Sequence, residues 1–325
     1  MLLELLRDML SIMTNLFIIG NGFDLAHGMK TRYTDFRQFL IDNYLYGSYE
    51  PYSFVDVPTT TLMPDGDEQY NETDIVKSIL SIIDNAEGVN WSDVETSLAD
   101  LPYETFLDDY DFYDKEDDNY IRDTFYRNYS LATSLCGALE QIDYYFQEWI
   151  SQIDIAPKIN LEFKKVIDIQ NDLFLTFNYT NTLQRLYQVK NVCHIHGKAE
   201  ENLFFGHGDN ECPKDYYEKN WFGAQDSLEN LFFSLKKDTE NAYNKNKSFF
   251  ENIKISAIEK PLTIYSYGFS FSLADRYYLK KICDIIDTSK ICFYMNNYDS
   301  PERRKMFENI LRECGFKGTT GEFFI

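Results

Sequence analysis

The chain has 325 residues, of which 44% are hydrophobic, so it can bury the core of one large or two ordinary globular domains. Its 31 basic and 53 acidic residues give a net charge of −22. A surface this acidic disfavours broad binding to nucleic acid or to anionic membranes, although a local pocket can still bind an anion.

Six cysteines without a Cys-x-x-Cys pair favour reduced thiols in a cytoplasmic protein and give little support for structural zinc. No apolar run approaches the roughly 20 residues that a membrane span needs, so we expect a soluble protein. Residues 1–12 form an amphipathic helical pattern that lacks the basic start and the cleavage site of a secretion signal. We expect an N-terminal extension over 1–12, or a helix that packs on a partner, before a single domain over 13–325.

A strand, a glycine turn and a helix open this domain. Leu16–Ile19 is predicted to be a buried strand, the chain turns at Gly20-Asn21-Gly22, and Thr34–Tyr44 has the apolar spacing of a helix. Glycines let a backbone approach a ligand, and the amides of such a turn favour an anion. We expect Gly20, Asn21 and Gly22 to bind a nucleotide phosphate, with Asp24 and His27 beside them. The alternative is a tight turn without a ligand, with Asp24 as a local cap.

A largely helical layer is expected as an insertion over about residues 45–160. A long connection comes first, and the dense acidic stretch 108–119 is expected to be a solvated loop, with a partner or self-association surface as the alternative. The expected helices of this layer are Thr73–Asn85, Ser92–Leu98 and a long pattern over Arg122–Ile153.

The second half alternates short apolar runs with helical patterns, which predicts a parallel sheet. The expected strands are Leu173–Phe177, Val192–Ile195, Leu203–Phe205, Leu262–Tyr267, Ile291–Met295 and Glu322–Ile325. The expected helices are Thr180–Tyr187, Asp226–Asn241, Leu273–Ile286 and Pro301–Cys314. Together with the first unit, this alternation predicts an α/β fold with a doubly wound, mostly parallel, Rossmann-like sheet.

Polar side chains follow the strands of this second half. Asn178 comes directly after Leu173–Phe177, where its amide can point at a ribose or an attacking water. Thr180 stands beside it, although Thr180 and its neighbours are also good helix caps. Gly268 and Ser270 follow Leu262–Tyr267 and could hold a ribose or a phosphate.

The histidines cluster in the same kind of segment. Residues two apart share a face of a strand, so His194 and His196 would line one side, and His196 stands next to Gly197 at the strand end. A neutral imidazole there suits general-base chemistry on a hydroxyl or a water. His207 lies between two glycines about ten residues further on. His194, His207 and Asp209 could form a metal site, but no His-x-x-x-His helix pair supports one, and we expect no metal.

The sequence allows two roles for each of two carboxylates. Asp275, after the Gly268 turn, is expected either near the ligand or, like Ser272, as a cap of the following helix. Glu95, four residues after Trp91, is expected either to reach the pocket or to lie exposed on a helix.

Taken in order, these pieces resemble the AbiH family of bacteriophage abortive-infection proteins. The matching segments are Gly20–Gly28, Thr176–Leu183, His194–Gly197, Tyr267–Ser270 with Asp275, and Trp91–Glu95, which resembles a Trp and Glu signature of that family. The resemblance covers nearly the whole chain from Asn15, and the Gly-Asn-Gly-Phe-Asp turn is its most specific piece. It implies an antiphage role.

The same order of pieces is similar, more distantly, to sirtuin-like NAD-consuming domains. That similarity implies that Gly20 and Gly22 hold the pyrophosphate of NAD, that Asn178 orients ribose or water, and that His196 acts as the base. Thr180 stands where sirtuin-like domains carry an aspartate, and the paired Cys-x-x-Cys zinc sites are missing, so a protein deacylase is disfavoured. The other expected ligand contacts are Asn21, Asp24, His27, Thr180, Gly197, His207, Gly268, Ser270 and Asp275.

We therefore expect an enzyme that takes NAD or a related nucleotide as substrate or ligand and hydrolyses the nicotinamide–ribose bond in response to a phage-derived trigger, with a homo-oligomer as a further option. One alternative is a non-catalytic sensor or regulator in which the pocket binds a nucleotide to control the oligomeric state, which Thr180 favours. A weaker alternative is a metal-dependent nuclease or phosphohydrolase. The acidic net charge argues against action on long DNA.

Overall fold

The structure is a computed structural model that describes residues 14–49, 58–66, 68–84, 95–101, 103, 119–155, 158–199, 201–259 and 262–325. The described residues form two compact units. The sheet unit takes its residues from 1–31, 150–204 and 238–325, and the helical unit takes its residues from 32–149 and 205–237. The chain therefore leaves the sheet unit twice and returns to it twice.

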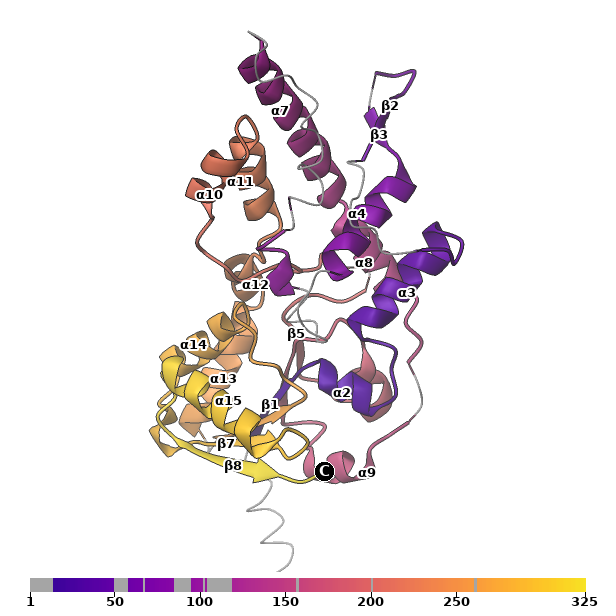
Figure 1. Cartoon of the computed structure of the whole chain (residues 1–325). Coiled ribbons are helices and arrows are strands. Elements are labelled where there is room, and N and C mark those ends of the chain that lie inside the picture. Colours follow the sequence, from indigo (N-terminus) through magenta and orange to yellow (C-terminus); the bar gives the residue numbers. More distant parts are fainter. Residues whose placement is uncertain are drawn as a thin grey trace, which may run out of the picture. The chain divides into compact units, whose positions relative to one another are not determined.

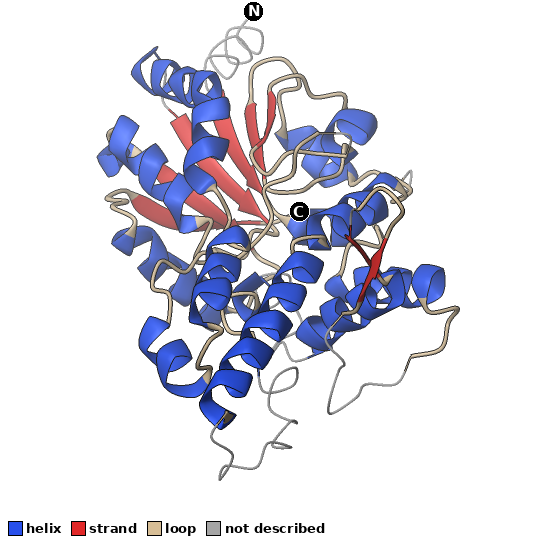
Figure 2. Cartoon of the chain, turned by 90° about the horizontal axis from the view of Figure 1, so that it is seen from above, coloured by secondary structure: helices blue, strands red, loops and turns tan. Residues whose placement is uncertain are grey.

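Six of the described strands form one parallel sheet in the order β5-β4-β1-β6-β7-β8. Figure 2 shows strands in red and helices in blue. The strands of this sheet are β1 (Thr14–Ile19), β4 (Leu173–Thr176), β5 (Val192–His194), β6 (Leu262–Tyr267), β7 (Cys292–Asn296) and β8 (Thr319–Phe323). Counted within the sheet, this is the 3-2-1-4-5-6 order of a doubly wound fold, in which ligands bind beyond the carboxyl ends of the strands where the order reverses. That point lies between β1 and β6. The predicted α/β fold class is confirmed.

Alternating side chains build a core on each face of this sheet. Leu16 and Ile18 of β1 belong to one buried cluster, whereas Phe17 and Ile19 belong to the other. Because both faces are covered, β1 appears in the sequence as an uninterrupted apolar run.

An aromatic ladder crosses one of these faces. Phe174, Phe17, Tyr265 and Tyr294 occupy paired register positions on four neighbouring strands. Their rings stack with centroid distances of 5.1, 5.0 and 5.2 Å. Stacked pairs of this kind contribute about 0.5–1.5 kcal/mol each beyond their buried area. The ladder therefore helps to fix the strand register, and with it the positions of the loops that follow the strands.

Helices cover both faces of the sheet. One core contains side chains of α12, α13, α14 and α15, and the other contains side chains of α2, α9 and η1. Figure 1 shows α13, α14 and α15 together on one side of the strands. The bounds are α2 (Asn21–Ala26), α9 (Leu161–Val166), the π-helical turn η1 (Leu183–Tyr187), α12 (Thr239–Lys245), α13 (Lys247–Glu259), α14 (Arg276–Ile285), the 3₁₀ turn η2 (Thr288–Lys290) and α15 (Pro301–Glu313).

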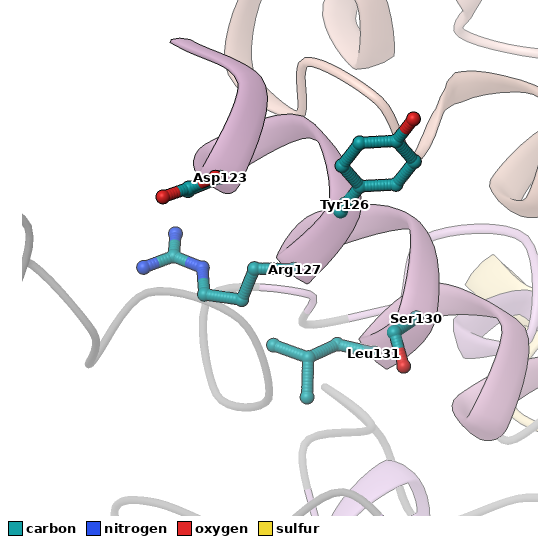
Figure 3. Close-up of a pocket in the computed structure, with 5 residues that line it drawn as sticks. All are labelled: Asp123, Tyr126, Arg127, Ser130 and Leu131. Carbon is teal, nitrogen blue, oxygen red and sulfur yellow. The ribbon is translucent and has the colours of Figure 1, made fainter. Parts of the chain in front are cut away.

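The helical unit is held together by aromatic contacts. Phe146 packs edge-on against Phe36 at 5.4 Å and stacks on Phe205 at 4.5 Å between ring centroids. A hollow of about 410 Å³ beside α7 is lined by Asp123, Tyr126, Arg127, Ser130 and Leu131 (Figure 3). The elements are α3 (Tyr33–Tyr44), β2 (Thr60–Leu62), β3 (Glu68–Tyr70), α4 (Glu72–Asp84), α7 (Tyr120–Leu139), α8 (Ile142–Ser151), α10 (Lys214–Asn220) and α11 (Gln225–Ser234).

Two expected helices are each divided in the structure. The pattern over 122–153 breaks at Glu140 and Gln141 into α7 and α8, although both residues are good helix formers, so tertiary packing overrides propensity there. The pattern over 226–241 breaks where Lys237 donates its backbone N–H to the His207 carbonyl oxygen. Asp238 then caps α12 by accepting the N–H of Asn241 at 3.0 Å.

The expected strand Leu203–Phe205 is wrong. Phe204 makes a single backbone bond, from its N–H to the His196 carbonyl oxygen at 2.9 Å, and its side chain packs on the core instead of pairing in a ladder. The helix expected from Thr180 begins only at Leu183, because the hydroxyls of Thr180 and Thr182 form other bonds. The last strand begins at Thr319, three residues before its expected start at Glu322.

The β2–β3 hairpin, the helices α9, α10 and α13 and the turn η2 were not predicted from the sequence. Residues 1–12, Trp91 and most of the acidic stretch 108–119 lie outside the described residues. None of the helices in the described chain is long and apolar enough to span a membrane.

Candidate functional site

The loops after β1, β4, β5 and β6 carry most of the predicted site residues, and all of these loops belong to the sheet unit. Parallel strands end at the same edge of a sheet, so these loops share one end of the unit. His207 is different, because it belongs to the helical unit.

The glycine turns after β1 and β6 pack against each other. The N–H of Gly20 donates to the Tyr267 carbonyl oxygen, and the N–H of Gly22 donates to the Gly268 carbonyl oxygen, both at 3.0 Å. A Cβ on Gly20 would lie 2.4 Å from the Gly268 oxygen, and a Cβ on Gly268 would lie 2.3 Å from the Phe23 nitrogen. The absence of a Cβ at these glycines thus allows the two loops to pack closely. The N–H groups of Gly20 and Gly22, which were expected to bind an anion, donate to carbonyl oxygens of the protein instead.

A buried polar cluster lies beside this contact. Thr180 donates its hydroxyl to Asp24 Oδ2 at 2.5 Å, and the hydroxyls of Thr180 and Thr182 lie 2.9 Å apart. Asn178 donates its side-chain amide to the Gly20 carbonyl oxygen at 3.1 Å and its backbone N–H to Thr176 Oγ1 at 3.1 Å. These bonds tie the β1 and β4 loops together.

Burial dominates the chemistry of Asp24. Loss of solvent raises the pKa of this carboxyl to about 6, and the polar side chains of Thr180, Thr182 and Asn178 nearby only partly oppose that rise. Two buried acceptor atoms of the cluster, Asp24 Oδ1 and Asn178 Oδ1, have no hydrogen-bond partner among the described residues. The cluster can therefore still accept hydrogen bonds.

A second pair joins the β5 and β6 loops. His196 Nε2 lies 3.1 Å from Asp275 Oδ1, and the two side chains are only 4% and 7% exposed. Three aromatic rings surround the imidazole, with centroid distances of 5.2 Å for Phe177 and 5.9 Å for Tyr179 and Tyr278. A carboxylate this close to Nε2 favours a proton on that nitrogen through electrostatic attraction.

Asp275 has the position of a helix cap but does not act as one. It is the residue before α14, and its carboxylate makes no capping bond to the described helix. Its own N–H reaches Ser272 Oγ at 3.4 Å. Phe271, in the same loop, has a φ of 58° and is 2% exposed. A bulky residue in the left-handed region is strained, so surrounding packing holds this loop in place.

Two other histidines of the sheet unit make bonds that hold the fold. His27 Nδ1 lies 2.7 Å from the Phe23 carbonyl oxygen, and its Nε2 lies 2.5 Å from the Tyr187 hydroxyl. His194 Nδ1 lies 3.0 Å from the Asn178 carbonyl oxygen, and its Nε2 lies 2.7 Å from the Gln184 amide. Burial lowers the pKa of both imidazoles, which favours their neutral forms.

Two of the remaining predicted ligand contacts also have local partners. Asn21 donates its side-chain amide to the Thr31 carbonyl oxygen at 2.8 Å, which pins the segment after α2. Gly197 donates its N–H to the His194 carbonyl oxygen at 3.0 Å. Ser270 is half-buried in the β6–α14 loop.

In the helical unit, His207 and Glu95 have bonds of their own. His207 Nε2 lies 2.8 Å from the Phe232 carbonyl oxygen, and its Nδ1 accepts the N–H of Asp209 at 3.2 Å. Glu95 forms an ion pair of 2.6 Å with Lys237. Within the residues that the structure describes, no three His, Cys, Asp or Glu side chains are grouped to hold a metal ion.

The sequence indicated the residues of these clusters one by one but not their pairing. His196 is expected from the sequence to be the base and Asp275 a ligand contact or cap, whereas the structure brings their side chains together. Thr182 is expected only as a cap, and its hydroxyl belongs to the Asp24 cluster. A hydroxyl run directly after a buried strand was the available signal, and it is also typical of ordinary helix starts.

Comparison with curated proteins and with solved structures gives no match. The family model described as "Bacteriophage abortive infection AbiH" matches residues 16–296, which include most of β1, all of β4 to β7 and both polar clusters. The chain belongs to the AbiH family of bacteriophage abortive-infection proteins.

Proposed function

We propose that this protein acts in abortive infection as an enzyme that binds NAD or a related nucleotide at the carboxyl end of the sheet and hydrolyses it. Family membership supports the antiphage role. The observation that carries the enzymatic part is the buried pair of His196 and Asp275 at 3.1 Å. A general base oriented by a carboxylate is a recurrent arrangement in hydrolytic sites.

The proposed reaction breaks the bond between nicotinamide and the ribose of NAD. A water oxygen forms a bond to the ribose C1′ carbon, its proton passes to Nδ1 of His196, and nicotinamide leaves as a neutral base with the electron pair of the broken bond. The products are nicotinamide, ADP-ribose and a proton. Asp275 stabilises the imidazolium that forms, and Asn178 orients the water or the ribose.

The strand order supports a nucleotide as the ligand. In doubly wound sheets of this order, dinucleotides bind across the point where the order reverses. Here the β1 and β6 loops meet at that point, and the bonds of Gly20 and Gly22 keep two amides for the protein itself. The proposal therefore places the ribose, rather than the pyrophosphate, next to the β1 turn.

The test is release of nicotinamide from NAD by purified protein, followed by chromatography. We expect release by the wild type and a loss of about 100-fold or more in His196→Ala. Asp287→Asn is the control for a substitution in the sheet unit, because Asp287 is an exposed residue that caps the turn η2. Release that is unchanged in His196→Ala at an unchanged melting temperature would remove His196 from the mechanism.

A second candidate is a sensor that binds the nucleotide without cleaving it. The burial of the His196 and Asp275 side chains, at 4% and 7% exposure, favours this option because a substrate reaches them only after a loop moves. Binding of NAD measured by calorimetry, together with no nicotinamide release, would select the sensor. Thr180, in place of a sirtuin-like aspartate, agrees with it.

A further inference from the structure

The Asp24 cluster is short of hydrogen-bond donors. The Thr180 hydroxyl donates a hydrogen bond to Asp24 Oδ2, and the Asn178 amide donates one to the Gly20 carbonyl oxygen. Asp24 Oδ1 and Asn178 Oδ1 remain as acceptors without a partner among the described residues. Both residues are more than nine-tenths buried, at 1% and 6% exposure.

The orientation of the Asn178 amide is determined by its surroundings. Its nitrogen lies 3.1 Å from the Gly20 carbonyl oxygen, which can only accept. Turning the amide over would place two acceptors against each other, so the side-chain oxygen has to be the atom without a donor. The lack of a donor for Asn178 Oδ1 therefore does not depend on how the amide nitrogen and oxygen were assigned.

Buried acceptors of this kind select a ligand by its donors. A phosphate brings only acceptors and negative charge, which the Asp24 carboxylate repels. A vicinal diol brings two adjacent O–H donors, one for each oxygen. A site with unsatisfied buried polar groups also discriminates strongly against an analogue that lacks the matching hydroxyl.

We propose that Asp24 and Asn178 bind the vicinal hydroxyls of a ribose, and that this pair makes the site specific for ribonucleotides over deoxyribonucleotides. The inference rests on the proposed function and names the part of the nucleotide that the β1 and β4 loops recognise. Thr180 is a positioning residue, because its hydroxyl holds the Asp24 carboxylate on the opposite oxygen.

The test compares matched ligands that differ by one hydroxyl. The probes are AMP against 2′-deoxy-AMP and nicotinamide mononucleotide against its 2′-deoxy analogue, with affinities measured by calorimetry on the full chain. For wild type we expect the ribonucleotide to bind about tenfold tighter or more. In Asp24→Ala the ratio should fall to about one.

Two further variants keep the test decisive. Asp24→Asn retains the shape and places an NH₂ group at the position of Oδ1, so the ratio should also fall even if Asp24→Ala does not fold. Asp172→Asn is the matched control, because Asp172 is a buried aspartate of the same unit whose two oxygens accept backbone N–H groups at 2.9 and 2.7 Å. It should leave the ratio unchanged.

The outcomes separate this inference from the proposed function. Equal affinity for ribo- and deoxyribonucleotides overturns the diol site, while His196-dependent nicotinamide release would still stand. Selective binding without any release supports the diol site and overturns the hydrolase. Stabilisation by MgCl₂ alone that is lost in Asp24→Asn would show a cation at these oxygens and overturn the diol.

Discussion

A buried aspartate lies at each end of the sheet, and the two differ in their hydrogen bonds. At the amino end, Asp172 precedes β4 and accepts the N–H of Asn15 on one oxygen and that of Asp168 on the other. At the carboxyl end, Asp24 accepts from Thr180 on one oxygen, and its second oxygen has no partner among the described residues. Burial raises the pKa of both carboxyls to about 6.

The difference separates a structural carboxylate from a candidate binding group. Burial raises the pKa of the two aspartates by a similar amount, so burial alone does not distinguish them. Backbone N–H groups donate to both oxygens of Asp172, and these bonds join β1 to the segment before β4. The incomplete shell of Asp24 lies at the end of the sheet where α/β folds bind ligands. Hydrogen-bond satisfaction, more than burial, distinguishes the candidate binding group Asp24 from Asp172.

The largest expected effect concerns turnover. Asp275→Asn should lower nicotinamide release by about 10²–10⁴-fold, because the amide no longer stabilises the charged His196 ring. Asp172→Asn at the other end should leave release within about twofold, measured at a temperature where both variants are folded. A similar loss in both variants would mean that general destabilisation, and not the site, controls activity.

The next effect tests the contact between the glycine turns. Gly268→Ala should destabilise the protein by about 4 kcal/mol, since its Cβ would lie 2.3 Å from the Phe23 nitrogen at a φ of 65°. Gly28→Ala is the matched control, with a φ of 80° and nothing within 4 Å of the added Cβ. It should cost about 1 kcal/mol. Urea unfolding of both variants measures the difference, and equal losses would contradict the close contact.

The pH dependence of stability sharpens the comparison further. The pKa of Asp24 rises from 3.8 unfolded to about 6 folded, so between these values the folded state binds the proton more tightly. Wild-type stability should therefore fall as pH rises from about 4 to about 6, by roughly 3 kcal/mol from this group at most. The Asp24→Asn variant has no carboxyl at this position, so its stability should not fall with pH for this reason. The stability difference between Asp24→Asn and wild type should grow over that window and stay constant above it, and a flat difference would contradict the buried carboxylate.

The smallest expected effect concerns the amino end. Asp172→Ala leaves the N–H groups of Asn15 and Asp168 without their acceptor and should cost about 2 kcal/mol of folding free energy. Ribonucleotide binding should not change. Chemical unfolding and calorimetry of the same sample measure both quantities, and a loss of binding in a folded variant would show that the two ends are not independent.

Much of the sheet unit was predictable because its signals are local. The runs around Phe17, Phe174 and Ile264 are long enough, and apolar enough, to be read as buried strands, and a turn follows each. The run at Leu203–Phe205 has the same composition but forms no strand. Composition shows that a segment is buried, whereas pairing depends on a neighbouring strand that is distant in sequence.

The candidate site shows the same limit. Asn178, His196, Gly268 and Asp275 stand out in the sequence because each follows an expected strand. Nothing local indicates that His196 reaches Asp275, which is 79 residues further along the chain. The glycines of the first turn also suggested room for a ligand, and the structure fills that room with the Gly268 backbone.

The sequence by itself determined the fold class, the family and the loops that carry polar side chains, since periodicity and short motifs are written along the chain. Only the tertiary structure decided which of these side chains meet, which amides are already used and which buried oxygens lack a donor. Those properties arise from contacts between residues that are remote in sequence, and the hydrogen bonds of a buried group can be counted only when all of its neighbours are in place.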